Sequence, residues 1–121
     1  MKVVIDLIED IRESIQNEER YTLSGMLLKE NPENSKDLIY AGEAPIGSFY
    51  FDKIAKELIF TIQKEGDPLT MGELVKNLLI LEMDMMMYEV KLAVSVDHEA
   101  KVLVGFGFNA TDAKYALFIM A

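Results

Sequence analysis

The 121-residue sequence predicts a two-layer α+β fold with about six mostly antiparallel strands and two helices on one face of the sheet. Residues 70–96 change from a helical to a strand-like hydrophobic period, and residues 3–30 show a similar succession. Turn-forming residues then separate further short apolar stretches. We therefore expect a single domain, residues 1–121, in which residues 1–63 and 70–121 are two copies of a helix-strand-strand-strand unit.

Residues 70–96 contain the clearest pattern. Thr70 precedes Glu73 by three positions, a spacing that lets each side chain cap a main-chain amide at the start of a helix. Apolar residues follow at helical spacing. They are Met71, Leu74, Val75 and Leu78. From Tyr88 to Val96 apolar and polar residues alternate, as in a strand with one buried face. This pattern predicts a helix over 71–83 and a strand over 88–96.

The other elements follow from the same rules. Residues 3–16 place isoleucine, leucine and valine on one helical face and acids on the other, which predicts the first helix. Apolar stretches bounded by Gly, Pro, Asn and Asp predict the remaining strands. Their expected ranges are 21–30, 44–51, 57–63, 101–108 and 115–120. Because proline has no amide hydrogen, Pro45 indicates an edge or a bulge.

The two halves can be aligned by residue type. Tyr88 follows Tyr21 by 67 positions, and at this offset Asp6-Leu7-Ile8 falls on Glu73-Leu74-Val75. Further along, an offset of 58 places Ala55-Lys56 on Ala113-Lys114. The shared order of elements supports an internal repeat with an insertion near residues 31–43.

Composition narrows the classes of function. The net charge is −9 at pH 7, which disfavours direct contact with nucleic acid because phosphates attract basic surfaces. The chain has no cysteine, so disulfides, thiolate metal sites and cysteine nucleophiles are excluded. We see no secretory signal core and no apolar stretch long enough to span a membrane. We therefore expect a cytoplasmic protein without a cofactor, a bound metal or a membrane partner.

Residues able to carry chemistry are few. His98, the only histidine, lies in a charged turn without a second ligand at metal-binding spacing, so we interpret it as an exposed turn residue. Glu82 and Asp84 stand among apolar residues, where burial could raise a carboxyl pKa. The end of the second helix would explain them equally well. Gly105-Phe106-Gly107 lacks the third glycine of a dinucleotide turn. No catalytic residue is predicted.

One difference between the halves points to an interface. Where the first half has Arg12-Glu13 and Glu18-Glu19-Arg20, the second has Leu79-Ile80 and Met85-Met86-Met87. Methionine suits adaptable contact surfaces. These apolar residues could form a two-fold dimer contact, or they could fill the centre of a monomer core. The candidate interface residues are Leu79, Ile80, Met83, Met85, Met86 and Met87.

Three functions are compatible with this sequence. The first is a non-enzymatic interaction module that forms a homodimer through its second half or binds another protein. The second is a small-molecule-binding protein or enzyme with a pocket between the helices and the sheet. The third is an acidic inhibitor of a basic protein, suggested by the net charge.

Overall fold

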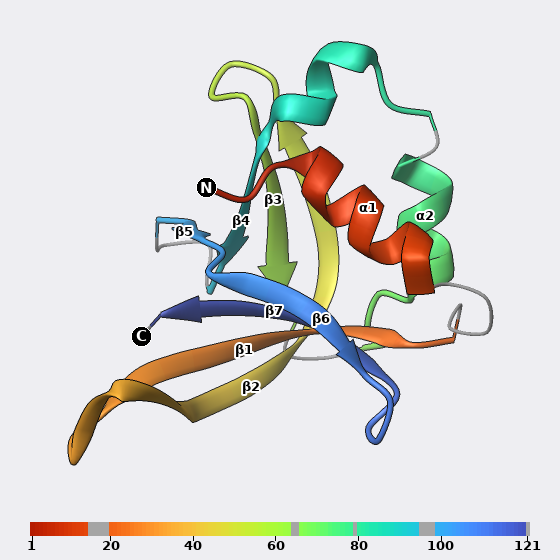
Figure 1. The fold of residues 1–121 in the computed structure, drawn as a ribbon. Coiled ribbons are helices and arrows are strands. Elements are labelled where there is room, and N and C mark those ends of the chain that lie inside the picture. The colour runs from red at the N-terminus through yellow and green to blue at the C-terminus, as the bar shows by residue number, and fades with distance from the viewer. Residues whose placement is uncertain (15–19, 64–65, 79, 95–98, 121) are drawn as a thin grey trace.

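A computed structural model describes residues 1–14, 20–63, 66–78, 80–94 and 99–120. Helix α1 (Val4–Ser14) and helix α2 (Met71–Leu78) bury their apolar faces, and a short 3₁₀ helix, η2 (Met83–Met87), follows α2. Both α-helices lie at the end of the molecule away from the hairpin tip near residues 31–34 (Figure 1). The α+β class is therefore as predicted.

The described residues form one seven-stranded sheet. The strands are β1 (Thr22–Asn31), β2 (Asn34–Asp52), β3 (Glu57–Ile62), β4 (Glu89–Ala93), β5 (Lys101–Val102), β6 (Gly105–Asn109) and β7 (Lys114–Met120). Their spatial order is β5-β4-β3-β2-β1-β7-β6. The β1–β7 and β3–β4 pairs are parallel, and the other pairs are antiparallel.

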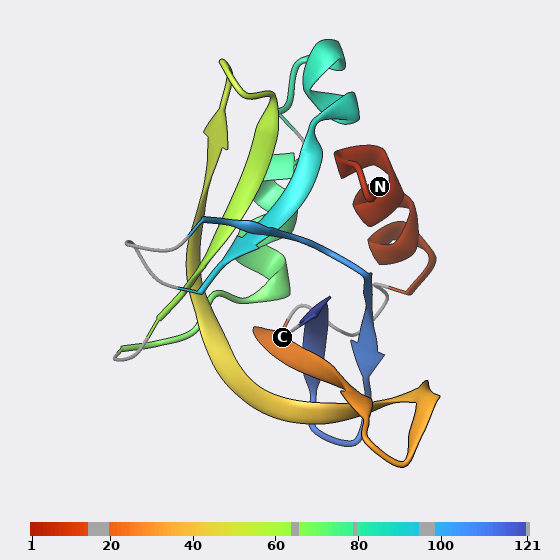
Figure 2. The same ribbon diagram turned by 90° about the vertical axis from the view of Figure 1, so that its left-hand side faces the viewer.

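The sheet is strongly curved. Strands β5 and β6 stand at opposite ends of the spatial order, yet only Leu103 and Val104 separate them in sequence. In a flat sheet the end strands would lie roughly 29 Å apart, at about 4.8 Å per strand. The short connection reaches roughly 10 Å. The sheet therefore curls until residues 101–109 cross between its two edges, as Figure 2 shows, a closure that the two-layer prediction did not include.

The start of each half is hydrogen-bonded to the first strand of the other half. The amide of Val4 donates to the carbonyl of Tyr88 over 2.9 Å, and the amide of Met71 donates to the carbonyl of Tyr21 over 2.8 Å. The donors Val4 and Met71 are 67 positions apart in sequence, and so are the acceptors Tyr21 and Tyr88. The same offset relates a second pair of bonds, Val90 to Lys2 and Leu23 to Leu69, each 2.8 Å long. The two halves thus exchange equivalent contacts.

The later strands correspond at an offset of 57, not at the predicted 58. Glu57 pairs with Glu89, and Lys114 pairs with Thr22, so Glu57 and Lys114 occupy equivalent places. The residues before them, Lys56 and Ala113, both have positive φ, 58° and 53°. Residue similarity favoured the wrong offset, and a shift of one position exchanges the two faces of a strand. We call residues related by these offsets, 67 and 57, counterparts.

Several predicted boundaries change. The second helix ends at Leu78 and not at residue 83. The Asn77 side chain donates to the Glu73 carbonyl over 2.8 Å, the kind of side-chain bond that competes with helix continuation. The predicted strand 44–51 is part of the longer β2, whose first portion pairs with β1 and second with β3. The predicted strand 101–108 is divided into β5 and β6. These changes raise the expected six strands to seven.

One apolar core joins the helices to the sheet. Val4, Leu7 and Ile11 of α1 and Met71, Leu74 and Leu78 of α2 belong to it. Strand residues, Met85 of η2 and residues of the connections complete the cluster, and Tyr115 is the largest of its fully buried side chains. The core therefore draws on both halves of the chain.

Candidate functional site

The structure divides the six candidate interface residues. Ile80, Met83 and Met87 are largely exposed, at 80%, 87% and 68% of their surface. Met85 is 7% exposed and belongs to the core, and Met86 is half-buried against it. Leu79 lies outside the described residues. Of the five candidates that the structure describes, three side chains are thus largely accessible to a partner.

A fourth exposed apolar residue lies at the same end of the molecule. Ile54, in the turn between β2 and β3, is 97% exposed. That turn is joined to the residues after η2, because the amide of Glu89 donates to the carbonyl of Lys56 over 3.1 Å. Figure 1 shows the turn and η2 at the top of the molecule. We call Ile54, Ile80, Met83 and Met87 together the η2 surface.

Sequence reasoning missed Ile54, although a signal was present. An isoleucine inside the polar turn Asp52–Lys56 has no role in the alternation of either neighbouring strand. The counterpart turn between β6 and β7 has Thr111 at this position, and the counterpart of Met87 is Arg20. Both Thr111 and Arg20 are exposed. At these two counterpart positions, one in each half, the chain is therefore polar.

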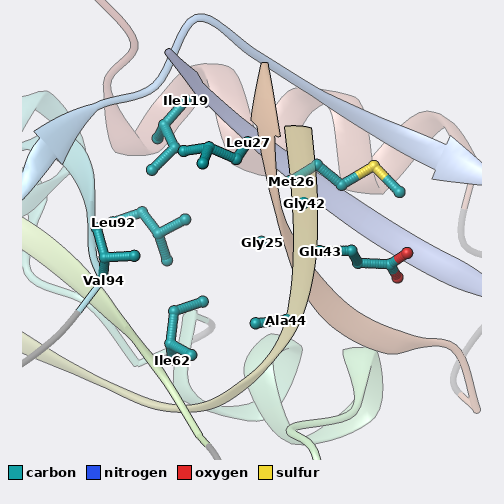
Figure 3. A pocket seen from close by; sticks show the side chains of 10 residues that line it. All are labelled: Gly25, Met26, Leu27, Gly42, Glu43, Ala44, Ile62, Leu92, Val94 and Ile119. Carbon is teal, nitrogen blue, oxygen red and sulfur yellow. The ribbon is translucent and has the colours of Figure 1, made fainter. Parts of the chain in front are cut away.

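A second feature is an apolar cavity of about 150 Å³ inside the curved sheet. Its lining comes from strands β1, β2, β3, β4 and β7 and from Val94 just after β4, and no helix residue takes part. Figure 3 shows Leu27, Ile62, Leu92, Val94 and Ile119 converging on the space, while Met26 and Glu43 point away from it. This cavity therefore does not lie between the helices and the sheet, where a pocket was predicted.

Counterpart residues line the cavity in pairs. Leu27 corresponds to Val94, and Ile62 corresponds to Ile119. The third pair is unequal, because Gly25 corresponds to Leu92. A Cβ on Gly25 would lie 2.8 Å from methyl carbons of both Ile62 and Leu92. The absence of a side chain at Gly25 therefore lets the opposite side chains cover β1.

A polar cluster lies on the other side of β1. The Ser24 hydroxyl donates to Glu43 Oε1 over 2.8 Å, and the Lys114 ammonium donates to the same oxygen over 2.5 Å. Lys114 and, to a smaller extent, Ser24 lower the pKa of the Glu43 carboxyl, while Glu43 raises the pKa of Lys114. A carboxylate with a lowered pKa is a poor proton acceptor. Because Ser24 is also buried, this cluster does not form an activated serine nucleophile.

The other candidates carry no chemistry in the described structure. Glu82 immediately precedes η2 and Asp84 lies in its first turn, and both are exposed, so their place in the sequence reflects the end of α2. Gly105 and Gly107 belong to strand β6. His98 lies outside the described residues. Within the ranges that the structure describes, no group of three His, Cys, Asp or Glu side chains could hold a metal ion.

Two further findings bear on function. Of the helices in the described part of the chain, none has the length and apolar composition required to cross a bilayer. Comparison with models of protein families, with curated protein sequences and with solved structures finds no match. The site itself must therefore carry any proposal about function.

Proposed function

We propose that this protein is a non-enzymatic interaction module that forms a homodimer through the η2 surface. One observation carries the proposal: Ile54 and Met87 are exposed where their counterparts are Thr111 and Arg20. Since the backbone at both places is held by equivalent bonds, folding does not require apolar side chains there. Exposed apolar clusters of this kind are typical of interaction sites.

The charges around the η2 surface suit a two-fold contact. Lys53 and Lys56 flank Ile54, and Glu82 and Asp84 flank Met83, all four being exposed. In a two-fold dimer, the η2 segment of one copy can lie against the β2–β3 turn of the other, and the reverse. This arrangement sets lysines opposite carboxylates twice. Such complementarity selects the partner and its orientation.

Two further proposals concern origin and location. We infer that residues 1–63 and 70–121 are copies of one helix-strand-strand-strand unit, which the exchanged hydrogen bonds support. The cytoplasm stays our expected location, because a chain without cysteine does not depend on an oxidising compartment to fold.

The test compares two matched substitutions in the counterpart turns. Ile54→Glu and Thr111→Glu each add one negative charge at the tip of an equivalent β-hairpin. We expect light scattering to show a dimer for the wild type and for Thr111→Glu, and a monomer for Ile54→Glu. Circular dichroism should show the same fold for all three. The dimer should bury at least about 1,200 Å² in total.

Two outcomes would contradict this proposal. One is a wild-type monomer at high protein concentration, and the other is equal dissociation of the two glutamate variants. Met85→Glu is an additional control, because Met85 belongs to the core. We expect that variant to lose its fold and not only its partner.

An acidic inhibitor is the competing interpretation of the same surface charge. This interpretation predicts a monomer that binds a basic protein, and it predicts that the binding weakens as salt is added. The η2 surface favours the dimer because its exposed centre is apolar and carries both signs of charge at its edge.

A further inference from the structure

The apolar cavity is separate from the η2 surface and has its own chemistry. Five of its ten lining residues are leucine, isoleucine or valine, and Glu43, the one charged residue among the ten, points away from the space (Figure 3). A space of about 150 Å³ with such walls has room for a molecule the size of benzene. Water that fills it finds few hydrogen-bond partners on the walls, so an apolar group can displace that water favourably. The cavity therefore suits an apolar group of about six carbon atoms.

The cavity reaches the surface at Val94, whose side chain is exposed. An apolar ligand can therefore enter without opening the core. Filling the space would restore contacts that the lining side chains lack on one side, since packed atoms attract only at contact distance.

One cation lies beside this cavity. Lys101 on β5 is the cross-strand partner of Leu92, so its side chain leaves the sheet on the same face as that of Leu92. Its ammonium group donates to the Met120 carbonyl over 3.3 Å, next to Ile119. Leu92 and Ile119 both line the cavity. Lys101 thus spans from β5 to β7 at the edge of the apolar space.

Two lysines in the described ranges are already paired with carboxylates, and Lys101 is not one of them. Lys91 and Lys114 form ion pairs with Glu57 and Glu43, whereas Lys101 has no carboxylate partner among the described residues. Lys101 is also exposed, so its ammonium can leave the carbonyl and meet an anion. Its counterpart is Ala44, which lines the cavity from β2. A positive charge therefore occurs at one side of the cavity and a methyl group at the other.

We propose that this cavity binds a small monocarboxylate, with its apolar tail between Leu92 and Ile119 and its carboxylate on the Lys101 ammonium. Aliphatic walls select the tail, and the charge of Lys101 selects a carboxylate over an alcohol or an amine, since the Glu43 side chain points away from the space. The two parts of the site come from different strands and are brought together by the closure of the sheet.

The test uses hexanoate as the probe, with hexan-1-ol and hexylamine as chain-matched controls. Binding is followed by methyl NMR signals of Ile62, Leu92 and Ile119. We expect saturable shifts with hexanoate at a dissociation constant of about 1 mM, since so short a chain buries little surface. Hexanol should bind about three-fold more weakly, the effect of one exposed ion pair.

Two substitutions separate the tail from the charge. Ala44→Leu should fill the cavity and abolish the shifts. Lys101→Gln should bring hexanoate to the affinity of hexanol, while Lys76→Gln, the same charge change on α2, should leave it unaltered. Repeating the titration on the Ile54→Glu variant separates this site from the dimer contact, because we expect binding to be unchanged there.

Three results would overturn the proposal. They are no saturable shift at about 10 mM hexanoate, unchanged binding in Ala44→Leu, and equal binding of hexanoate and hexylamine. If Ala44→Leu fails to fold, the comparison of Lys101→Gln with Lys76→Gln decides alone. Equal affinity of those two variants for hexanoate would then contradict the site.

Discussion

The hydroxyl of Tyr115 donates a 2.7 Å hydrogen bond to Oδ2 of Asp10, joining strand β7 to helix α1 across 105 positions of sequence. Tyr115 is fully buried, and its burial, with a smaller effect of the Asp10 charge, raises the pKa of its hydroxyl well above the ordinary value of 10. The counterpart of Tyr115 is Leu58, which is also fully buried. The polar link is therefore confined to the contact between α1 and β7.

Tyr115→Phe tests this link. At pH 7 we expect the free energy of unfolding to fall by about 1 to 1.5 kcal/mol, the usual effect of one lost hydrogen bond. Because the folded-state pKa is raised, the stabilisation is complete below pH 10 and is lost as the pH rises further. Urea unfolding at pH 7 and above pH 10 should show the difference from wild type narrowing. If the two proteins differed by the same free energy of unfolding at every pH, the stabilisation would not come from the protonated Tyr115 hydroxyl.

Glu43→Gln tests the polar cluster with Ser24 and Lys114. About a third of the Glu43 and Lys114 side chains is exposed, so the loss at neutral pH should stay below about 1 kcal/mol. The pKa of Glu43 is lowered, chiefly by Lys114. Its stabilisation is therefore complete above the ordinary value of 4.5 and is lost as the pH falls through the lower folded-state value.

The measurement for this cluster is thermal unfolding from pH 7 to strongly acidic pH. Wild type and Glu43→Gln should converge at acidic pH. The exposed Glu33 supplies the control, and Glu33→Gln should follow the wild type throughout. A gap between wild type and Glu43→Gln that persists in strong acid would show that the charge of Glu43 is not what matters.

Gly47→Ala tests close packing at the irregular register between β2 and β3. A Cβ at residue 47 would lie 2.3 Å from the Cβ of Gln63, which a rotation of the Gln63 side chain cannot relieve. We expect a loss of about 2 kcal/mol or more in chemical denaturation. Gly107 on β6 has no heavy atom within 4 Å of its Cβ position, so Gly107→Ala should change stability by less than about 0.5 kcal/mol. Similar losses at both glycines would refute the packing argument.

Thr70→Ala tests the start of α2. The Thr70 hydroxyl accepts a hydrogen bond from the amide of Glu73 over 3.3 Å, so we expect the variant to lose about 1 kcal/mol of stability. Glu73→Ala should cost less than about 0.5 kcal/mol, because the described structure shows no return bond from that carboxylate. Thermal unfolding of both variants distinguishes these effects. A larger loss for Glu73→Ala would mean that the return bond forms in solution.

The capping pattern shows how far local sequence reasoning reaches. A reciprocal pair was predicted at Thr70 and Glu73, and one of its two bonds is confirmed. In the first half, the carboxylate of Asp6 instead accepts from the amide of Val3 over 3.0 Å. Asp6 is the counterpart of Glu73, and Val3 is the counterpart of Thr70. Each helix therefore begins with a different half of the motif, which residue spacing alone predicts only in outline.

Features that depend on distant contacts were harder to predict. The period-two pattern identified β4, in which buried and half-buried residues alternate. Apolar stretches between turn-forming residues identified β1, β3 and β7. The register between halves did not follow from residue similarity. It is set by main-chain bonds such as Glu89 to Lys56, in which any residue type can take part. The curling of the sheet likewise depends on pairings on opposite sides of Leu103 and Val104.

The candidate interface shows the same limit. Residue type placed Met83, Met85 and Met87 in one group, but the 3₁₀ turn points Met85 into the core and leaves the other two exposed. Ile54 joins them only through the fold, since it is distant in sequence. Apolar composition was thus a reliable sign of an unusual region and an unreliable guide to which side chain faces solvent.

The exchanged bonds between the halves have a consequence for synthesis on the ribosome. The amide of Val4 cannot form its hydrogen bond until Tyr88 has been synthesised. Leu7 and Ile11 cannot be fully buried until β7 has been synthesised, because β7 supplies part of the core. At about 5 to 20 residues per second, this delay lasts roughly 10 s. During that time the apolar face of α1 is available to chaperones. Translation speed through the second half therefore determines how long the first half stays unprotected.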